Sequence, residues 1–369
     1  MPDPKNLNPL AQIIKREITR HGAISFVRFM ELALYCPQLG FYERKKDSLG
    51  HAGDFYTSVS TGSLFGQLLA YQFADWLEAQ GRKSEVRIIE AGAHDGKLAV
   101  DILRWLKQQR PQLFAQLKYV ILEPSATRRA WQAETLNEFA DHLAWQSSTL
   151  DLRPSTLPTI FFSNELFDAF PVHRLGWDAG AKKWFEWGVS CDGDQFNWTR
   201  LSEKLEIENW KLKIAPGLLA ALPDGYTIEV CPAAEIFYGA AAASVGVGRL
   251  VTVDYGFSNS EELFEPARFA GTLRAYHRHQ VSDDLLAHVG EQDLTAHVNF
   301  PTLIASGELL DWHTETFQTQ SQFLTAIAAR VWKNSTTFGE WTPHLTRQFQ
   351  TLTHPEHLGR AFRVLVQSR

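Results

Sequence analysis

The segment VRIIEAGAHDGKLAVDILRWL, at residues 86–106, constrains the fold more than any other part of the chain. It begins with an apolar run, passes through Gly92 and Gly96, and continues with apolar residues at helical spacing. A buried strand, a glycine turn and a helix in this order are typical of the first unit of a nucleotide-binding α/β fold. The segment therefore predicts a parallel sheet with a ligand at the turn.

Strand-like runs alternate with helical patterns over most of the chain. The predicted strands are 86–91, 118–123, 142–147, 158–163, 226–231, 249–255 and 361–367. Continuous apolar runs are typical of strands covered on both faces, and their alternation with helices indicates a mostly parallel sheet between helical layers. Residues 172–198 interrupt this alternation with strand-like runs and glycine turns, so we predict a β insertion there.

The composition excludes several classes of partner. The net charge is −6 and the isoelectric point is near 6.1, with Lys and Arg scattered along the chain, so we expect neither nucleic acid nor an anionic membrane as a partner. Cys36, Cys191 and Cys231 are too far apart for a C-x-x-C pair, which favours a reducing compartment. The opening residues resemble no signal peptide and no apolar run reaches membrane-spanning length. We therefore expect a cytoplasmic protein without membrane insertion.

The loop GAHDGKL does not suit a phosphate ligand. A dinucleotide site needs G-x-G-x-x-G, but here His94 stands where the backbone must approach the pyrophosphate, and Asp95 adds a negative charge. A P-loop would need Ser or Thr after Lys97, and the chain has Leu98. S-adenosylmethionine has no phosphate and carries a sulfonium and an ammonium, so a carboxylate in the loop favours it.

The same segment offers further contacts for that cofactor. Glu90 ends the first strand, Gly92 and Gly96 permit a tight turn, and the helix start presents N–H groups to a carboxylate. Glu123 ends the second strand, where an acidic side chain can accept hydrogen bonds from both ribose hydroxyls. The alternative is a βαβ unit with surface carboxylates and no cofactor.

The segment SNELFDAFPVH follows the fourth predicted strand and carries candidate catalytic residues. Its amide, carboxylate and aromatic side chains are Asn164, Glu165, Asp168, Phe167 and Phe170. Carboxylates such as these can hold the guanidinium of an arginine substrate through paired hydrogen bonds. Transfer of the methyl group of S-adenosylmethionine mainly requires that the protein align the attacking nucleophile with it. Glu165 is the leading catalytic candidate, with Asn164 and Asp168 beside it. Asp168 equally fits the cap of a following helix.

A second polar region lies between residues 254 and 297. Asp254 and Tyr255 end a strand, and Arg274 and His277 open a histidine-rich stretch. We predict that these residues face the substrate as a lid, while solvated loop histidines are the alternative. The spacing of the histidines is irregular and no cysteines accompany them, so no metal site is predicted.

Eight blocks of the sequence together resemble the MidA-like class I methyltransferases. The blocks are GDFYTS (53–58), FG (65–66), IIEAGAHDGKLAVDIL (88–103), YVILEPS (119–125), FFSNELFDAFPVH (161–173), LVTVDYG (250–256), TLRAYHRH (272–279) and GEQDLTAHVNF (290–300). The chain departs from the family at His357, where methionine is expected, and at VSTG after FYTS. These departures leave the core assignment unchanged.

The resemblance implies a seven-stranded class I methyltransferase sheet that binds S-adenosylmethionine. It also implies that Asp54, Thr57 and Ser58 face the polar end of the cofactor, although an ordinary turn is the alternative. The expected organisation is a helical N-terminal extension at 1–82, a cofactor-binding core at 83–256, and a substrate lid with a helical region and the last strand at 257–369.

The family includes arginine methyltransferases linked to respiratory complex I assembly, which makes a protein that presents an arginine the expected substrate. Two alternatives stay open. The chain could methylate a small molecule, because fold does not determine substrate, or it could be an assembly chaperone that binds the cofactor without turnover.

Overall fold

The computed structural model describes residues 8–44, 57–80, 85–201, 216–278, 280–332 and 335–369. Its backbone contacts group the chain into two units. Unit 1 comprises Met1–Ser48, Asp168–Ala234 and Phe257–Asn299, and unit 2 comprises Leu49–Phe167, Glu235–Gly256 and Phe300–Arg369. The sequence suggested three consecutive segments instead, because sequence patterns do not show which distant segments pack together. Asp54 lies outside the described residues.

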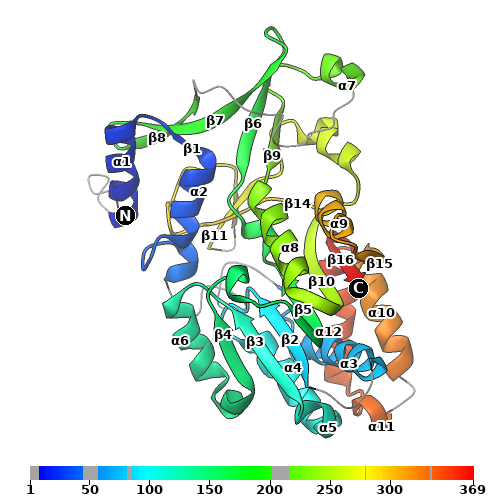
Figure 1. Cartoon of the computed structure of the whole chain (residues 1–369). Helices are drawn as coiled ribbons and strands as arrows, with labels where there is room; N and C mark the ends of the chain where they lie inside the picture. Colours follow the sequence, from blue (N-terminus) through cyan, green and yellow to red (C-terminus); the bar gives the residue numbers. More distant parts are fainter. Residues whose placement is uncertain (1–7, 45–56, 81–84, 202–215, 279, 333–334) are drawn as a thin grey trace. The chain divides into compact units, whose positions relative to one another are not determined.

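Unit 2 is built on a twisted, mostly parallel sheet (Figure 1). Its main path runs β15-β16-β10-β5-β2-β3-β4. The strands are β2 (Val86–Ala91), β3 (Leu117–Leu122), β4 (Leu143–Gln146), β5 (Ser155–Asn164), β10 (Val245–Phe257), β15 (His313–Thr319) and β16 (Phe362–Ser368). Strands β10, β5, β2, β3 and β4 pair in parallel, while β16 is antiparallel to both of its neighbours. The predicted α/β class is confirmed.

Helices cover both faces of this sheet. They are α3 (Leu64–Ala79), α4 (Lys97–Gln109), α5 (Pro111–Phe114), α6 (Ala126–Thr135), α8 (Pro232–Ser244), α9 (Phe300–Glu308), α10 (Gln320–Val331), α11 (Ser335–Phe338), α12 (Pro343–Thr353) and α13 (Leu358–Ala361). Consecutive β5 residues show the two layers: Phe161 packs on Phe237 of α8, and Phe162 packs on Phe73 of α3. Burial on both faces explains the continuous apolar runs of the parallel strands.

The described residues of unit 1 form the helices α1 and α2, the short helix α7 (Pro216–Ala221) and two small antiparallel sheets. Its helices α1 (Pro9–His21) and α2 (Phe26–Tyr35) begin at the side-chain caps of Asn8 and Ser25. One sheet has the order β1-β7-β6-β9, with β8 paired to β7. Its strands are β1 (Ile24–Ser25), β6 (His173–Asp178), β7 (Lys183–Asp192), β8 (Gln195–Arg200) and β9 (Thr227–Val230). The predicted β insertion is therefore present.

The second sheet of unit 1 has the order β12-β11-β13. Its strands are β11 (Arg274–His277), β12 (Gln280–Ser282) and β13 (Asp293–Thr295). Unit 1 also contains the two-residue strand β14 (Val298–Asn299). Buried apolar residues of α1 and α2 form one core with Val172, Val189 and Leu294.

Two strands differ from the sequence-based prediction. The run 226–231 was assigned to the parallel sheet, but β9 pairs antiparallel with β6 in unit 1, with Leu175 opposite Ile228. A short apolar run specifies a strand without specifying its partner. Strand β15 was not predicted, because its sequence HTETFQT is largely polar and only half-buried.

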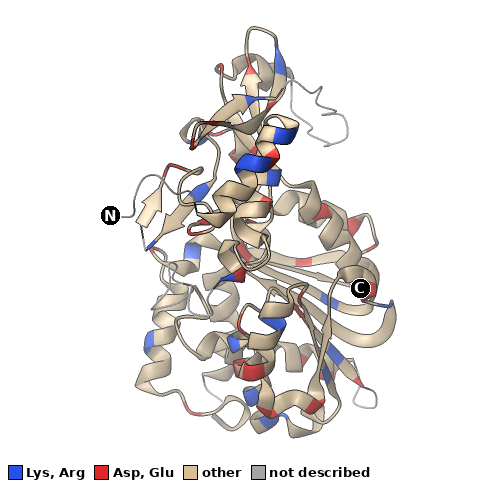
Figure 2. Ribbon diagram, turned by 90° about the vertical axis from the view of Figure 1, so that its left-hand side faces the viewer, with Lys and Arg blue, Asp and Glu red and all other residues tan. Residues whose placement is uncertain are grey.

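Charges of both signs are mixed along the described ribbon (Figure 2). This distribution agrees with the scattered Lys and Arg residues of the sequence. Among the described residues, no helix combines the length and the apolar character needed to cross a bilayer.

The core of unit 2 should be sensitive to loss of volume on α4. Leu103 is fully buried there, whereas Leu150 is 89% exposed. We expect Leu103→Ala to lower the free energy of unfolding by about 2–5 kcal/mol, because it leaves a cavity that the packed helices fill only partly. Leu150→Ala should change it by less than about 0.5 kcal/mol. Urea denaturation followed by circular dichroism measures both, and equal losses would contradict the described packing.

Candidate active site at the ends of the parallel strands

The candidate site of unit 2 lies where three parallel strands end side by side. Ala91 of β2 is paired with Ser163 of β5, and Asn164 is paired with Val253 of β10. The N–H of Glu165 donates to the carbonyl of Val253 over 2.9 Å, which carries the pairing one residue beyond β5. Parallel α/β sheets bind ligands at this carboxyl edge.

The glycine turn after β2 has the geometry that only glycine adopts readily. Gly92 has φ 80° and Gly96 has φ 85°, in the left-handed region. A Cβ atom at Gly92 would lie 3.0 Å from Leu166 Cδ1, and one at Gly96 would lie 3.1 Å from Leu136 Cδ1. His94 also has a positive φ, of 45°, which is strained for a residue with a side chain.

Asp95 turns its carboxylate toward the start of α4. Its Oδ1 accepts the N–H of Lys97 over 3.2 Å, and its Oδ2 lies 2.9 Å from Lys97 Nζ. Burial alone would raise the pKa of Asp95, but hydrogen bonds from His94 and Lys97 outweigh it and lower the pKa to about 2. The charged carboxylate therefore stabilises the turn and the helix start, a role that the sequence did not indicate.

Glu90 is buried beneath the turn and pairs with a tyrosine. Its Oε2 accepts the hydroxyl of Tyr119 over 2.6 Å, and the residue is 2% exposed. Burial raises the pKa of Glu90 to about 7, against the smaller lowering effect of the Tyr119 hydrogen bond. The side chain is thus held inside unit 2 at the end of β2.

Glu123 is also buried and makes several contacts within unit 2. Its Oε1 accepts the N–H of Ser125 over 2.9 Å and lies 3.1 Å from Arg128 Nε. Its Oε2 accepts a hydrogen bond from Gln132 Nε2 over 3.2 Å. Gln132 in turn donates to the carbonyl of His94, so Glu123 is tied to the glycine turn.

Glu165 occupies a strained backbone position beside Asn164. Its φ is 51°, which is uncommon for a residue with a long side chain and is found mainly where the surrounding structure imposes it. Its Oε1 accepts the Asn164 amide over 3.1 Å and the N–H of Ser58 over 3.3 Å. The carboxylate is thus held at the edge of the sheet between β5 and the 57–61 turn.

The turn that contains Thr57 and Ser58 is anchored by a helix from the C-terminal part of the chain. The hydroxyl of Ser58 is fully buried and donates to Gln320 Oε1 over 3.1 Å. Gln320 Nε2 donates to the carbonyl of Leu352, and Gln348 Oε1 accepts the N–H of Leu64. The sequence analysis did not identify Gln320 or Gln348, because a buried glutamine has no distinctive local pattern.

Asp254 holds the backbone behind Glu165. Its Oδ2 accepts the N–H groups of Leu166 and Phe167 over 3.2 and 3.0 Å, and its Oδ1 accepts the N–H of Tyr255 over 2.9 Å. These bonds favour a supporting position for Asp254 over direct contact with substrate. Phe167 is 5% exposed and packs on Tyr238, and Tyr255 packs on Phe362.

The remaining predicted site residues belong to unit 1. Asp168 is buried, and its backbone carbonyl accepts the N–H of Ala296 over 2.8 Å. Arg274 is exposed and donates to the carbonyl of Leu273, and the ring of His277 stacks on that of His288. The boundary between the units falls between Phe167 and Asp168.

Two polar atoms at the candidate site fit the requirements of S-adenosylmethionine. Asn164 Oδ1 and His94 Nε2 are buried and have no hydrogen-bond partner among the described residues. A buried acceptor without a partner is costly, so such atoms mark places where a ligand can donate. The cofactor carries an ammonium and ribose hydroxyls as donors, and Asn164 lies at the sheet edge where they would bind.

The fold and the site together define an α/β protein that binds a cofactor at the carboxyl edge of its sheet. Residues 68–318 match the family model described as "Putative S-adenosyl-L-methionine-dependent methyltransferase". Because the match covers more than half of the chain, the protein belongs to this S-adenosyl-L-methionine-dependent methyltransferase family, and S-adenosylmethionine is its cofactor.

Solved structures and curated relatives agree with this assignment. A protein from Burkholderia thailandensis, crystallised with S-adenosyl-homocysteine, is similar with a TM-score of 0.81 and 30% identity, covering 98% of this chain and 92% of that one. The zebrafish (Danio rerio) protein arginine methyltransferase NDUFAF7, mitochondrial, is 29% identical, covering 78% of this chain and 69% of its own. The human (Homo sapiens) protein of that name is 26% identical, covering 82% and 69%.

The relatives also correct one expectation. The zebrafish, mouse and human relatives are named as mitochondrial proteins. The prediction of a cytoplasmic location was therefore wrong. It rested on the composition and the opening residues, which do not specify a compartment.

The buried Glu90 should make stability depend on pH. In the folded state Glu90 loses its proton with a pKa of about 7, whereas the ordinary pKa of a glutamate is 4.5. Between these pH values the folded state binds more protons than the unfolded state, so this group lowers the free energy of unfolding as pH rises. Glu90→Gln stays neutral and can still accept the Tyr119 hydroxyl. We expect its stability relative to wild type to increase across this range by on the order of 3 kcal/mol.

Urea denaturation of the cofactor-free protein at pH 4.5, 6 and 7.5 measures this difference. Glu138→Gln, at an exposed residue paired with Arg104, controls for the loss of a surface charge. A difference between Glu90→Gln and wild type that stays constant with pH would show that folding does not raise the pKa of Glu90.

Proposed function

We propose that this protein transfers a methyl group from S-adenosylmethionine to an arginine side chain of a partner protein. The observation that carries the proposal is the Glu165 carboxylate, held at the sheet edge by the Asn164 amide and the Ser58 N–H. The relatives named protein arginine methyltransferase NDUFAF7 support it. We propose by the same similarity that the client belongs to respiratory complex I assembly.

The chemistry of a guanidinium suits this carboxylate. Arginine presents planar N–H donors that a carboxylate binds in a fixed geometry, whereas lysine offers a single rotatable ammonium. When Glu165 binds the N–H groups on one side of the planar guanidinium, the nitrogen on the opposite side is oriented. Positive charge is then localised near the carboxylate, away from that nitrogen. The cofactor supplies the methyl group on a sulfonium, and this chain contributes by aligning the nucleophile with it.

The strained backbone at Glu165 serves this role. Asp254 fixes the N–H groups of Leu166 and Phe167, and Val253 fixes the N–H of Glu165. The carboxylate is thereby oriented before substrate binds, and its orientation costs no free energy during the reaction. We assign catalytic roles to Glu165 and Asn164 and supporting roles to Asp254, Phe167 and Tyr255.

Three other residues remain proposed substrate contacts from unit 1. They lie in two of the sequence blocks that carry the family resemblance: Asp168 in 161–173, and Arg274 and His277 in 272–279. The exposed Arg274 suits an acidic position on a protein client.

For the cofactor, we propose that Glu123 accepts hydrogen bonds from the ribose hydroxyls and that the turn at Gly92 and Gly96 admits the methionine part. Asp95 contacts Lys97 at the start of α4, and Glu90 is held by Tyr119 at the end of β2, so we assign supporting roles to both. In this proposal Thr57 and Ser58 face the polar end of the cofactor.

Glu123→Ala should weaken binding of the demethylated cofactor, S-adenosyl-homocysteine. Two hydroxyl bonds to a carboxylate are lost, so we expect Kd to rise by roughly 10- to 100-fold. Glu134→Ala, at an exposed residue of helix α6, which begins three residues after Glu123, should leave Kd unchanged. Isothermal titration calorimetry measures both, and circular dichroism checks that each variant is folded. Equal affinities for Glu123→Ala and wild type would remove Glu123 from the ribose site.

Glu165→Gln should separate catalysis from cofactor binding. The variant keeps the size of the side chain but loses its charge, so we expect methyl transfer to fall by at least about 100-fold. The affinity for S-adenosyl-homocysteine should change by less than about threefold, which corresponds to about 0.7 kcal/mol. Glu138→Gln is the matched surface control. Tritiated cofactor with a cell lysate, followed by mass spectrometry of labelled bands, measures the transfer.

The identity of the labelled product decides between the functions. Methyl-arginine in a protein supports the proposal. A labelled small metabolite, methyl-lysine, or full turnover by Glu165→Gln would contradict it. Tight cofactor binding without any transfer would favour an assembly chaperone instead.

A further inference from the structure

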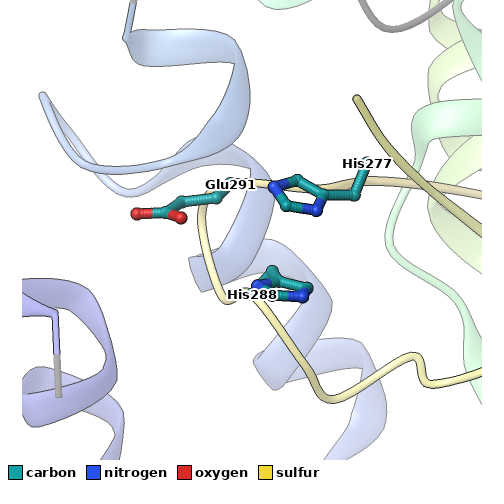
Figure 3. A group of neighbouring side chains, drawn as sticks. All are labelled: His277, His288 and Glu291. Atoms are coloured by element: carbon teal, nitrogen blue, oxygen red, sulfur yellow. The ribbon is translucent and has the colours of Figure 1, made fainter. Parts of the chain in front are cut away.

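His277, His288 and Glu291 of unit 1 lie together near the surface (Figure 3). One ligand atom from each residue lies within 4.8 Å of those of the other two. His288 is exposed and the other two side chains are partly buried. Two imidazoles and a carboxylate at this spacing form a recognised type of transition-metal ligand set.

The backbone fixes these three residues on adjoining segments. His277 ends β11, which pairs with β13 so that Tyr276 is opposite Asp293. Glu291 stands two residues before Asp293. His277 and Glu291 are therefore brought to the same end of this small sheet by strand pairing alone.

A tight turn brings His288 to the same place. Its φ is 44°, in the left-handed region, and its carbonyl accepts the N–H of Glu291 over 2.7 Å and that of Gln292 over 3.1 Å. The turn is anchored on the other side, because Asn8 Nδ2 donates to the carbonyl of Val289 over 2.7 Å. The strained position is thus held by the surrounding structure, as at functional sites.

We propose that His277, His288 and Glu291 bind one divalent transition-metal ion of the zinc class, which joins the end of β11 to the 288–291 turn. Imidazole nitrogens select zinc, nickel, cobalt or copper over magnesium and calcium, which prefer oxygen ligands. The carboxylate contributes one negative charge, which offsets half of the ion's charge of +2. Three protein ligands leave one tetrahedral position for water.

Rotation of the side chains brings the three ligand atoms to coordination distance of one ion. Tetrahedral zinc with Zn–N bonds of about 2.0–2.1 Å places its ligand atoms roughly 3.3 Å apart. The rings of His277 and His288 are stacked, with centroids 4.1 Å apart and planes 19° from parallel. They must turn so that both nitrogens point to one centre, and the exposure of His288 leaves room for this rotation.

Arg44 is the charged group that faces Glu291. Its Nη1 lies 3.4 Å from Glu291 Oε1 and donates to the carbonyl of Gly290 over 3.0 Å. The side chains of Arg44 and Glu291 are 46% and 37% exposed, so the pair contributes little stability. Glu291 can coordinate through its second oxygen while Arg44 holds the first, an arrangement that orients a ligating carboxylate.

The test is calorimetric titration of zinc chloride into the untagged, chelator-treated full chain. We expect one ion per chain with a micromolar Kd, release by a chelator, and no comparable binding of magnesium or calcium. His288→Ala and His277→Ala should each weaken binding by about 10-fold or more. His313→Ala, at an exposed histidine of β15 in unit 2, should bind zinc like wild type.

A thermal unfolding series separates a bound ion from surface adsorption. Zinc at a saturating concentration should raise the Tm of wild type and of His313→Ala, and leave that of His288→Ala unchanged. His288→Ala tests the site even if His277→Ala fails to fold, because His288 is exposed. Zinc binding that is unchanged in His288→Ala, or no binding below millimolar zinc, would overturn the proposal.

Discussion

The parallel pairing of β5 between β2 and β10 is the constraint on which the rest of the candidate site depends. Phe161 and Phe162 point to opposite faces of the sheet and pack against different helices. A slip of one residue would exchange these faces, so the register is strongly specified. Strand pairing therefore places Gly92, Glu165 and Asp254 at one edge, independently of side-chain contacts.

Much of the fold could be predicted from hydrophobic patterning because the sheet of unit 2 is buried on both faces. Strand β2 was predicted to the residue, and β3, β4, β5, β10 and β16 within a few residues. The same method failed for β15, since its place is set by pairing with β16 and its own sequence is largely polar. It also misplaced β9, because an apolar run carries no information about its partner strand.

The candidate site could be predicted in part, because strand ends and glycine turns have local sequence signatures. The directions of the side chains could not. Asp254 turns to the backbone of Leu166 and Phe167, and Asp95 turns to Lys97, through hydrogen bonds that depend on tertiary structure. The positive φ of Glu165 likewise follows from contacts that neighbouring sequence does not encode.

The chain order of these elements has a consequence for synthesis on the ribosome. Ser58 hydrogen-bonds to Gln320, a residue 262 positions later, and β16 enters the sheet beside β10 as its last strand. A nascent chain that has completed β10 therefore exposes an unpaired strand edge, and its 57–61 turn has no anchor. The turn and the strand edge therefore reach their final pairing only once Gln320 and β16 have been synthesised.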